Sequence, residues 1–163
     1  MKILSIDQST TNVGYCIFNN KDYIKSGTIL VHKPTQKKKY EYEFVDKSFS
    51  IIVELINKYN PDVIVMEEVF AGKSSGTLKL LATLKGMVIG YCKGIGINSE
   101  VVYPTSWKSF LKVHSKRDKE KVDVKNFFQS KYNIIIKEDD ESDAIGIGYY
   151  YVNKYLWWKA KTS

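Results

Sequence analysis

Four carboxylates at the ends of predicted elements are the residues of this sequence best suited to chemistry. Asp7 and Glu67 each follow a short apolar run, and Asp140 and Asp143 lie three residues apart. On a helix, residues three apart face the same way. Converging carboxylates repel one another unless cations join them, and such hard oxygen ligands suit magnesium or manganese. Two such ions ~4 Å apart would activate a water molecule and stabilise a leaving oxygen in phosphoryl transfer.

Each of these acids also has an ordinary structural interpretation. Asp7 can cap the turn after its strand, as Asp often does. Asp140 can act as a helix N-cap, and Asp143 can interact favourably with the helix dipole. Glu68 is expected to be a solvated neighbour of Glu67 on the opposite face, although a register slip of one residue would exchange them. The four acids together, on a basic chain, favour the metal site over these separate explanations.

The elements that would position these acids alternate between strands and helices. Apolar runs bounded by turn residues predict three antiparallel strands and then two later strands in parallel positions: Lys2–Ile6, Gly14–Phe18, Tyr23–Val31, Val63–Met66 and Ser99–Tyr103. Helical periodicity predicts helices over 40–59, Thr77–Lys93, Thr105–Lys112 (beginning at Pro104), Asp118–Tyr132, and Glu141 to about Trp158. We therefore expect an α/β fold with a mixed five-stranded sheet and helices on both faces. Sites in open α/β sheets form beyond the strand ends, where the acids are placed.

Composition restricts the class of protein. The chain has 163 residues, of which 44% are hydrophobic and 26% charged, as expected for one globular domain, here 1–163. The net charge of +7 favours a polyanionic partner. No apolar run approaches the ~20 residues of a membrane span, and no signal-peptide layout is present, which predicts a cytoplasmic protein without a membrane partner.

The predicted helix Thr77–Lys93 carries too many apolar residues for a single buried stripe. Such a helix faces both the core and a second surface, and a dimer partner is a reasonable expectation. Gly86 and Gly90 lie four residues apart and would allow close approach of a partner helix. The alternative is that both glycines are merely tolerated in the helix.

Three stretches resemble motifs of the RuvC-type Holliday junction resolvases, and they occur in that family's order over nearly the whole chain. They are Ile6–Ser9 with Gly14-Tyr15, Glu67–Phe70 followed by Lys73 and Leu78–Leu80, and Asp140–Ile145. The first two resemble the two leading acidic motifs and the start of the dimer helix, and the third resembles the C-terminal Asp-x-x-Asp-Ala motif. The small, divergent chain is most similar to phage-encoded members, which would act in the cytoplasm of the host cell.

The resemblance implies a ribonuclease H-like fold, a homodimer, and a structure-selective endonuclease that nicks two strands of a four-way DNA junction symmetrically. Its metal ligands would be Asp7, Glu67, Asp140 and Asp143, holding two Mg²⁺ ions per site, for which Mn²⁺ can substitute. Hydrolysis would leave a 5′-phosphate and a 3′-hydroxyl. No nucleotide cofactor is expected.

The resemblance also implies a set of DNA contacts. Phe70 matches an aromatic residue that stacks on a base near the junction, although ordinary packing is an alternative. Basic residues near the scissile phosphate, or along the DNA backbone, would come from Lys73, Lys108, Lys116, Arg117 and Lys119, and more widely from the Lys116–Lys125 cluster and the Lys154–Lys161 tail. Two stretches depart from the family pattern, because Gln8–Thr10 replaces a Pro-Gly-Ser turn and Ala71–Gly76 differs from the loop that reads sequence.

Three other interpretations remain open at this level. Asp7–Thr11 is also similar to the first phosphate loop of sugar kinases and actin-like ATPases, although the chain contains no second such loop. The chain can instead be a non-catalytic nucleic-acid-binding module of the same fold. The fold can also act on RNA or on branched DNA in general, because backbone contacts carry little sequence information.

Overall fold

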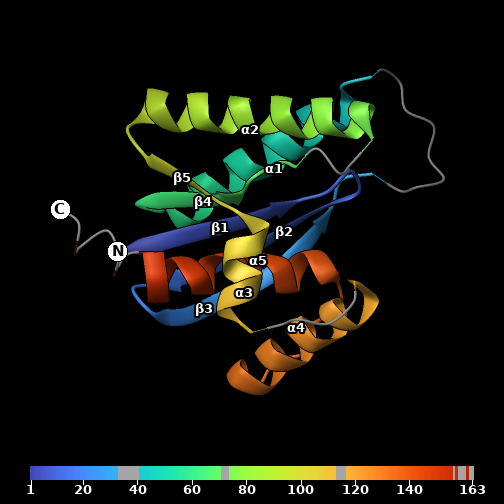
Figure 1. Ribbon diagram of the computed structural model, residues 1–163. Helices are drawn as coiled ribbons and strands as arrows, with labels where there is room; N and C mark the ends of the chain where they lie inside the picture. Colours follow the sequence, from blue (N-terminus) through green and yellow to red (C-terminus); the bar gives the residue numbers. More distant parts are fainter. Residues whose placement is uncertain (33–40, 71–73, 113–116, 156, 158–160, 162–163) are drawn as a thin grey trace.

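A mixed five-stranded sheet forms the central layer of the protein (Figure 1). The computed structural model describes residues 1–32, 41–70, 74–112, 117–155, 157 and 161. The strands lie in the spatial order β3-β2-β1-β4-β5, and they are β1 (Lys2–Gln8), β2 (Asn12–Asn19), β3 (Asp22–Leu30), β4 (Val63–Glu67) and β5 (Asn98–Val102). The first three strands are antiparallel, whereas β1, β4 and β5 run parallel. The predicted fold class is therefore confirmed.

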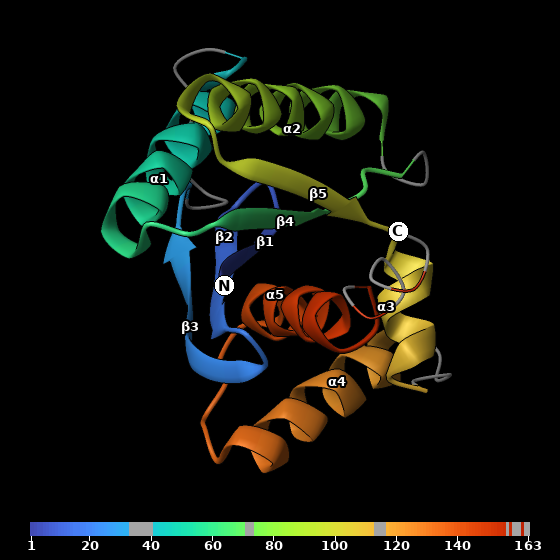
Figure 2. The same cartoon turned by 90° about the vertical axis from the view of Figure 1, so that its left-hand side faces the viewer.

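Helices cover both faces of this sheet (Figure 2). One face carries α1 (Glu43–Tyr59) and α2 (Ser75–Ile95), and the other carries α5 (Asp139–Tyr150), flanked by α3 (Pro104–Phe110) and α4 (Arg117–Tyr132). The central strands are buried on both sides, which explains their continuous apolar runs. Along β1, Leu4 and Ile6 join the core beneath α1 and α2, whereas Ile3 joins the core beneath α5.

Side-chain alternation along the central strands decides which acids face α5. Asp7 follows Ile3 and Ser5 on the α5 face of β1, and Glu67 follows Val63 and Val65 on the same face of β4. The two acids therefore reach the carboxyl ends of neighbouring parallel strands on the same side of the sheet.

Several of the predicted element boundaries differ from the structure, most of all at the last helix and the first strand. The last helix begins at Asp139 rather than Glu141, and its α-helical part ends at Tyr150. A π-helical turn, Tyr151–Tyr155, then replaces the α-helix that was predicted to continue to about Trp158. Acidic side chains in a first helical turn interact favourably with the helix dipole, which accounts for the earlier start. The first strand also runs on through Asp7 to Gln8, so Asp7 lies inside β1.

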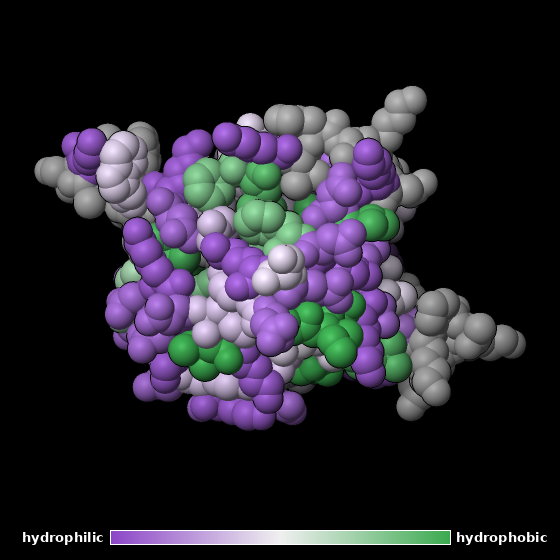
Figure 3. All heavy atoms as spheres, turned by 90° about the horizontal axis from the view of Figure 1, so that it is seen from below, coloured by the Kyte–Doolittle hydropathy of each residue, from purple (hydrophilic) through white to green (hydrophobic). Residues whose placement is uncertain are grey.

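The face that α4 forms is mainly hydrophilic, and its hydrophobic residues gather in separate patches (Figure 3). Across the part of the chain that the structure describes, no helix combines the length and the apolar character that a membrane span requires.

Candidate active site

The four predicted carboxylates line a single cavity of about 290 Å³. Asp7 and Glu67 reach it from the ends of β1 and β4, and Asp140 and Asp143 reach it from the beginning of α5. Three segments that are distant in sequence therefore meet at one site. The cavity is also lined by Gln8, Ser9, Lys108, Glu120, Lys121 and Val124.

Gly14 allows the first turn of α5 to approach the sheet beside Asp7. Gly14 pairs directly with Asp7 across β1 and β2. A Cβ atom at Gly14 would lie 2.0 Å from the backbone oxygen of Asp140. Because that neighbour is backbone, no side-chain movement could relieve the clash. A residue without a side chain is therefore required for this close approach, which brings Asp140 next to Asp7.

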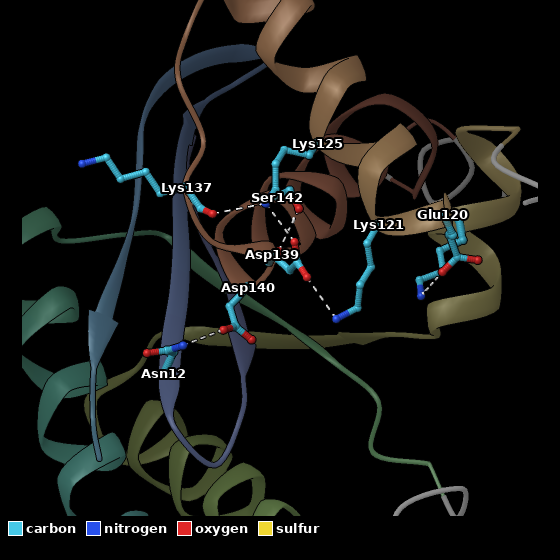
Figure 4. A network of polar contacts seen from close by, with 9 residues as sticks. Asn12, Glu120, Lys121, Lys125, Lys137, Asp139, Asp140 and Ser142 are labelled. Atoms are coloured by element: carbon cyan, nitrogen blue, oxygen red, sulfur yellow. Dashed lines mark hydrogen bonds and ion pairs between the residues drawn. The ribbon is translucent and has the colours of Figure 1, made fainter. Parts of the chain in front are cut away.

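Polar contacts fix the remaining part of this first turn. The Nδ2 of Asn12 donates to Oδ2 of Asp140 at 3.0 Å (Figure 4). Ser26 of β3 donates to Oε1 of Glu141 at 2.6 Å, and Ser5 donates to the Ala144 carbonyl at 2.7 Å. The N-cap position belongs to Glu138, so the interpretation of Asp140 as a helix cap is wrong. Asp140 and Asp143 instead project from the start of α5 into the cavity.

The surroundings of Asp143 strongly perturb the pKa of its carboxyl group. The pKa of its carboxyl group is raised to about 7, chiefly by burial; Lys108 opposes the shift, and the neighbouring Glu67 and Asp140 contribute to it. A carboxylate in such surroundings is stabilised either by a proton or by a cation that neutralises the cluster. The cavity therefore has the electrostatic character of a cation site.

Two lysines that line the cavity are paired with acids outside the group of four. Lys108 Nζ lies 2.5 Å from Oε1 of Glu120, and Lys121 Nζ lies 3.0 Å from Oδ2 of Asp139 (Figure 4). Burial lowers the pKa of Lys108, but the contact with Glu120 and the nearby Asp143 raise it by more. The hydrogen bond to Asp139 raises the pKa of Lys121. Both lysines are therefore positively charged next to the four acids.

Glu67 and Glu68 leave the end of β4 in different directions. Trp107 Nε1 donates to Oε1 of Glu67 at 2.8 Å, on the α5 side of the sheet. Glu68 forms an ion pair with Lys85 of α2, and this contact lowers the pKa of Glu68. The predicted opposite orientation of the two acids is confirmed. The expectation that Glu68 is simply solvated is wrong, because it has a partner and its side chain is only 25% exposed.

Phe70 lies beside a second, smaller cavity of about 180 Å³ that Asp7 and Glu67 also line. Its side chain is 48% exposed, and its ring packs edge-on against Tyr103 with centroids 6.1 Å apart. Packing therefore occupies only part of the ring. Phe70 thus lines the same small cavity as the two acids that end β1 and β4 while about half of it stays exposed.

The predicted basic residues are only partly brought to this site. Lys108 lines the cavity, whereas Lys119 is exposed on α4 and Lys121 lines the cavity in its place. Residues two apart on a helix point in different directions. The predicted phosphate contact at Lys119 is therefore two residues away from the lysine that lines the cavity, Lys121. Lys73, Lys116 and the side chain of Arg117 lie outside the described residues.

The donor set suits a hard divalent cation in its chemistry, because carboxylate oxygens are the ligands that Mg²⁺ and Mn²⁺ prefer. In the described ranges, however, no three His, Cys, Asp or Glu side chains are close enough to hold a metal as they stand. Hydrogen bonds hold Glu67 toward Trp107 and Asp140 toward Asn12. Side-chain rotation within the cavity would be needed to bring the carboxylates together around a cation.

Comparisons with known proteins give one consistent family. Residues 3–149 match the family model described as crossover junction endodeoxyribonuclease RuvC. The RuvC protein of Citrifermentans bemidjiense is 28% identical over 153 residues, which cover 90% of this chain and 89% of that protein. The RuvC protein of Rickettsia typhi is 24% identical over 157 residues, 91% of this chain and 95% of that one.

Two solved structures share the fold. RuvC of T. thermophilus, in complex with a Holliday junction substrate, superposes with a TM-score of 0.70 at 15% identity, covering 92% of this chain and 94% of that one. The Fowlpox virus resolvase, in complex with Holliday junction DNA, gives a TM-score of 0.60 at 22% identity, covering 96% of this chain and 99% of that one.

Proposed function

This chain belongs to the family of the crossover junction endodeoxyribonuclease RuvC, whose members are metal-dependent endonucleases, and we propose that its four-carboxylate cavity hydrolyses phosphodiesters at four-way DNA junctions. One observation carries the proposal. Asp7, Glu67, Asp140 and Asp143 come from three distant segments and line the same cavity. In this proposal residues 1–163 form one nuclease domain.

The four acids would hold two Mg²⁺ ions, or Mn²⁺ in their place. When bound, such cations lower the pKa of an attacking water molecule and neutralise charge on the leaving 3′-oxygen. Asp143 must give up its proton before it can bind a cation, because its pKa of about 7 leaves it partly protonated at neutral pH. The products would carry a 5′-phosphate and a 3′-hydroxyl.

Lys108 and Lys121 supply positive charge at the rim of the same cavity, where they would bind phosphate oxygens of the scissile strand. Each would exchange its present partner, Glu120 or Asp139, for a phosphate. Lys119 on α4, together with Lys73, Lys116 and Arg117, would contact the DNA backbone. The half-exposed ring of Phe70 would stack on an unpaired base of the junction.

A homodimer would place two such sites against two opposed strands of a junction, which has matching two-fold symmetry. The surface of α2 supports this assembly. Gly86 and Gly90 are exposed, and a Cβ atom added at either would have no neighbour within 4 Å among the described residues. A partner helix could therefore approach the α2 backbone closely.

The test is a cleavage assay on a synthetic four-way junction with Mg²⁺, beside an unbranched duplex of the same sequence. Wild-type protein should introduce paired, symmetric nicks in the junction only. Asp7→Asn should abolish these nicks and leave junction binding intact, because the carboxylate and not the fold is changed. Cleavage retained by Asp7→Asn would overturn the assignment of the site.

Two adjacent glutamates offer a matched control. Glu67→Gln should abolish cleavage, whereas Glu68→Gln removes only the charge that pairs with Lys85 and should leave cleavage largely unchanged. The reverse result would mean that Glu68 is the functional acid at the end of β4. Forks, flaps and RNA–DNA hybrids tested in parallel would define the preferred substrate.

A further inference from the structure

Trp107, in α3, makes a direct contact with one of the four acids. Its side chain is 0% exposed, and its Nε1 donates to Oε1 of Glu67 at 2.8 Å. A buried indole N–H requires an acceptor, and here the acceptor is a carboxylate that lines the cavity. The donor is neutral, so it orients Glu67 without cancelling its charge.

The indole ring also contacts the helix that carries Asp140 and Asp143. A Cβ atom at Gly146, three residues after Asp143, would lie 2.6 Å from Cζ3 and 2.8 Å from Cε3 of Trp107. The ring therefore lies against the backbone of α5, where only glycine leaves room for it. This contact sets how closely α5 approaches the end of β4.

The next residue along the chain completes the arrangement. Lys108 Nζ lies 5.3 Å from the centroid of the Trp107 ring, within the range of a cation–π contact. One side chain thus touches the acid from β4, the helix that carries two more acids, and the lysine at the rim of the cavity.

We propose that Trp107 is a positioning residue of the cation site, which holds Glu67 through its N–H and spaces α5 from β4 through its ring. The inference rests on the proposed function, because it assumes that Glu67 binds a cation. Outer partners that orient metal ligands commonly change metal affinity by ~10–100-fold when they are removed. Loss of the N–H should therefore weaken cation binding even when the ring remains in place.

The sharpest test replaces Trp107 by 3-benzothienylalanine, in which a sulfur atom stands in place of the indole N–H and the ring size is kept. The matched control places the same residue at Trp157, whose side chain is 58% exposed. Mn²⁺ binding is measured on the full chain without DNA, from the electron paramagnetic resonance signal of the free ion. We expect the Kd for Mn²⁺ to rise about tenfold for the substitution at 107 and to stay unchanged for that at 157.

A second readout separates positioning from general damage to the fold. Junction cleavage by the variant at 107 should recover as the Mn²⁺ concentration is raised, with a higher half-saturating concentration and a nearly unchanged maximal rate. Trp107→Phe, which keeps an aromatic ring without the N–H, should show the same displacement of the Mn²⁺ dependence. Thermal unfolding of each variant shows whether it is folded under the assay conditions.

The outcomes distinguish this inference from the proposal on which it rests. If the wild-type protein binds Mn²⁺ and the benzothienylalanine variant binds it with the same affinity, the role of Trp107 is overturned and the proposed function stays intact. Cleavage that high Mn²⁺ fails to restore in a folded variant would also overturn it, because a positioning role acts through cation affinity. Wild-type protein that neither binds Mn²⁺ nor cuts junctions would overturn the proposed function itself.

Discussion

The helices α5 and α2 both contain glycines, but the two sets lie in opposite surroundings. In α5, a Cβ atom at Gly148 would lie 2.5 Å from Ser5 Oγ. In α2, a Cβ atom at Gly86 or Gly90 would have no described neighbour within 4 Å. Contacts within the chain therefore require glycine in α5, whereas the described contacts do not require it in α2.

This difference separates two tasks on opposite faces of the sheet (Figure 2). Close contact between α5 and the strands holds Asp140 and Asp143 at a fixed place beside Asp7 and Glu67. The open surface around Gly86 and Gly90 of α2 is the surface that would face the partner in the proposed dimer. Substitutions on the two helices should accordingly affect different measurements.

The largest loss of stability and cleavage is expected from a substitution that contacts the beginning of α5. Gly14→Ala would force the Asp140 backbone away from β2, because the added Cβ would lie 2.0 Å from the Asp140 oxygen. Overpacking of this kind typically costs about 1–3 kcal/mol and sometimes more, and a backbone clash belongs at the upper end. Urea unfolding should show a loss of about 3 kcal/mol, and junction cleavage should disappear because Asp140 moves. A variant as stable and active as wild type would show that α5 can shift without consequence.

A pH-dependent effect should also arise from Asp143 in α5. The pKa of Asp143 is raised to about 7, mainly by burial, whereas an unfolded Asp has a pKa of about 3.9. Between about pH 4 and 7 the folded protein therefore binds more protons than the unfolded chain. Its free energy of unfolding without metal should fall as pH rises through this window, by up to about 4 kcal/mol.

Asp143→Asn tests whether the Asp143 carboxyl group causes this pH dependence of stability. It should flatten the pH dependence of urea unfolding and make the metal-free protein more stable at pH 7, while junction cleavage is lost. Mg²⁺ should reduce the decline in wild type, because the cation replaces the proton. An unchanged slope in Asp143→Asn would assign the pH dependence to other groups.

A smaller loss of stability is expected from a substitution near the C-terminal end of α5. Gly148→Ala would press against Ser5 Oγ and the ring of Phe18, at 2.5 and 2.6 Å. Because side chains can shift, we expect a loss of about 1–3 kcal/mol in urea unfolding. Cleavage at saturating Mg²⁺ should persist, since Gly148 does not line the cavity of the four acids and its neighbours here are side chains. Complete loss of cleavage in a folded variant would mean that the whole helix moves as a rigid unit.

The sequence predicts the fold and the four acids for a clear physical reason. Strand and helix periodicity follow from local burial, and acids that end apolar strands stand out against the buried residues before them. Asp7 and Glu67 were identified in this way, and the structure brings them to one cavity with Asp140 and Asp143.

The partners of these acids depend on tertiary contacts that no local pattern encodes. In the sequence alone, nothing distinguishes Trp107 from a core residue or Asn12 from a turn residue. Their contacts with Glu67 and Asp140 are formed only when the chain is folded. Lys121 rather than Lys119 lines the cavity because of the rotation of α4, which spacing along the chain does not determine. The sequence signal that could indicate a site role for Trp107 is its position directly before Lys108, a predicted DNA contact.

The smallest effect on the free energy of unfolding is expected in α2. Gly86→Ala places a methyl group in open space, so it should raise helix stability by about 0.5–1 kcal/mol through the propensity difference between the two residues. If α2 forms the dimer surface, the same methyl group should hold the partner helix away. The dissociation constant of the dimer should then increase, as measured by sedimentation velocity over a concentration series.

Concentration separates these two effects of Gly86→Ala, because the stability of a dimer depends on protein concentration and that of a monomer does not. Gly76→Ala, in the first turn of α2, is the matched control, since an added Cβ there also has no described neighbour within 4 Å. Weaker association in Gly86→Ala alone would place the partner over the middle of α2. Unchanged association with increased stability would mean that glycine at this position is merely tolerated, and the contrast between α2 and α5 would then reflect only the packing of α5.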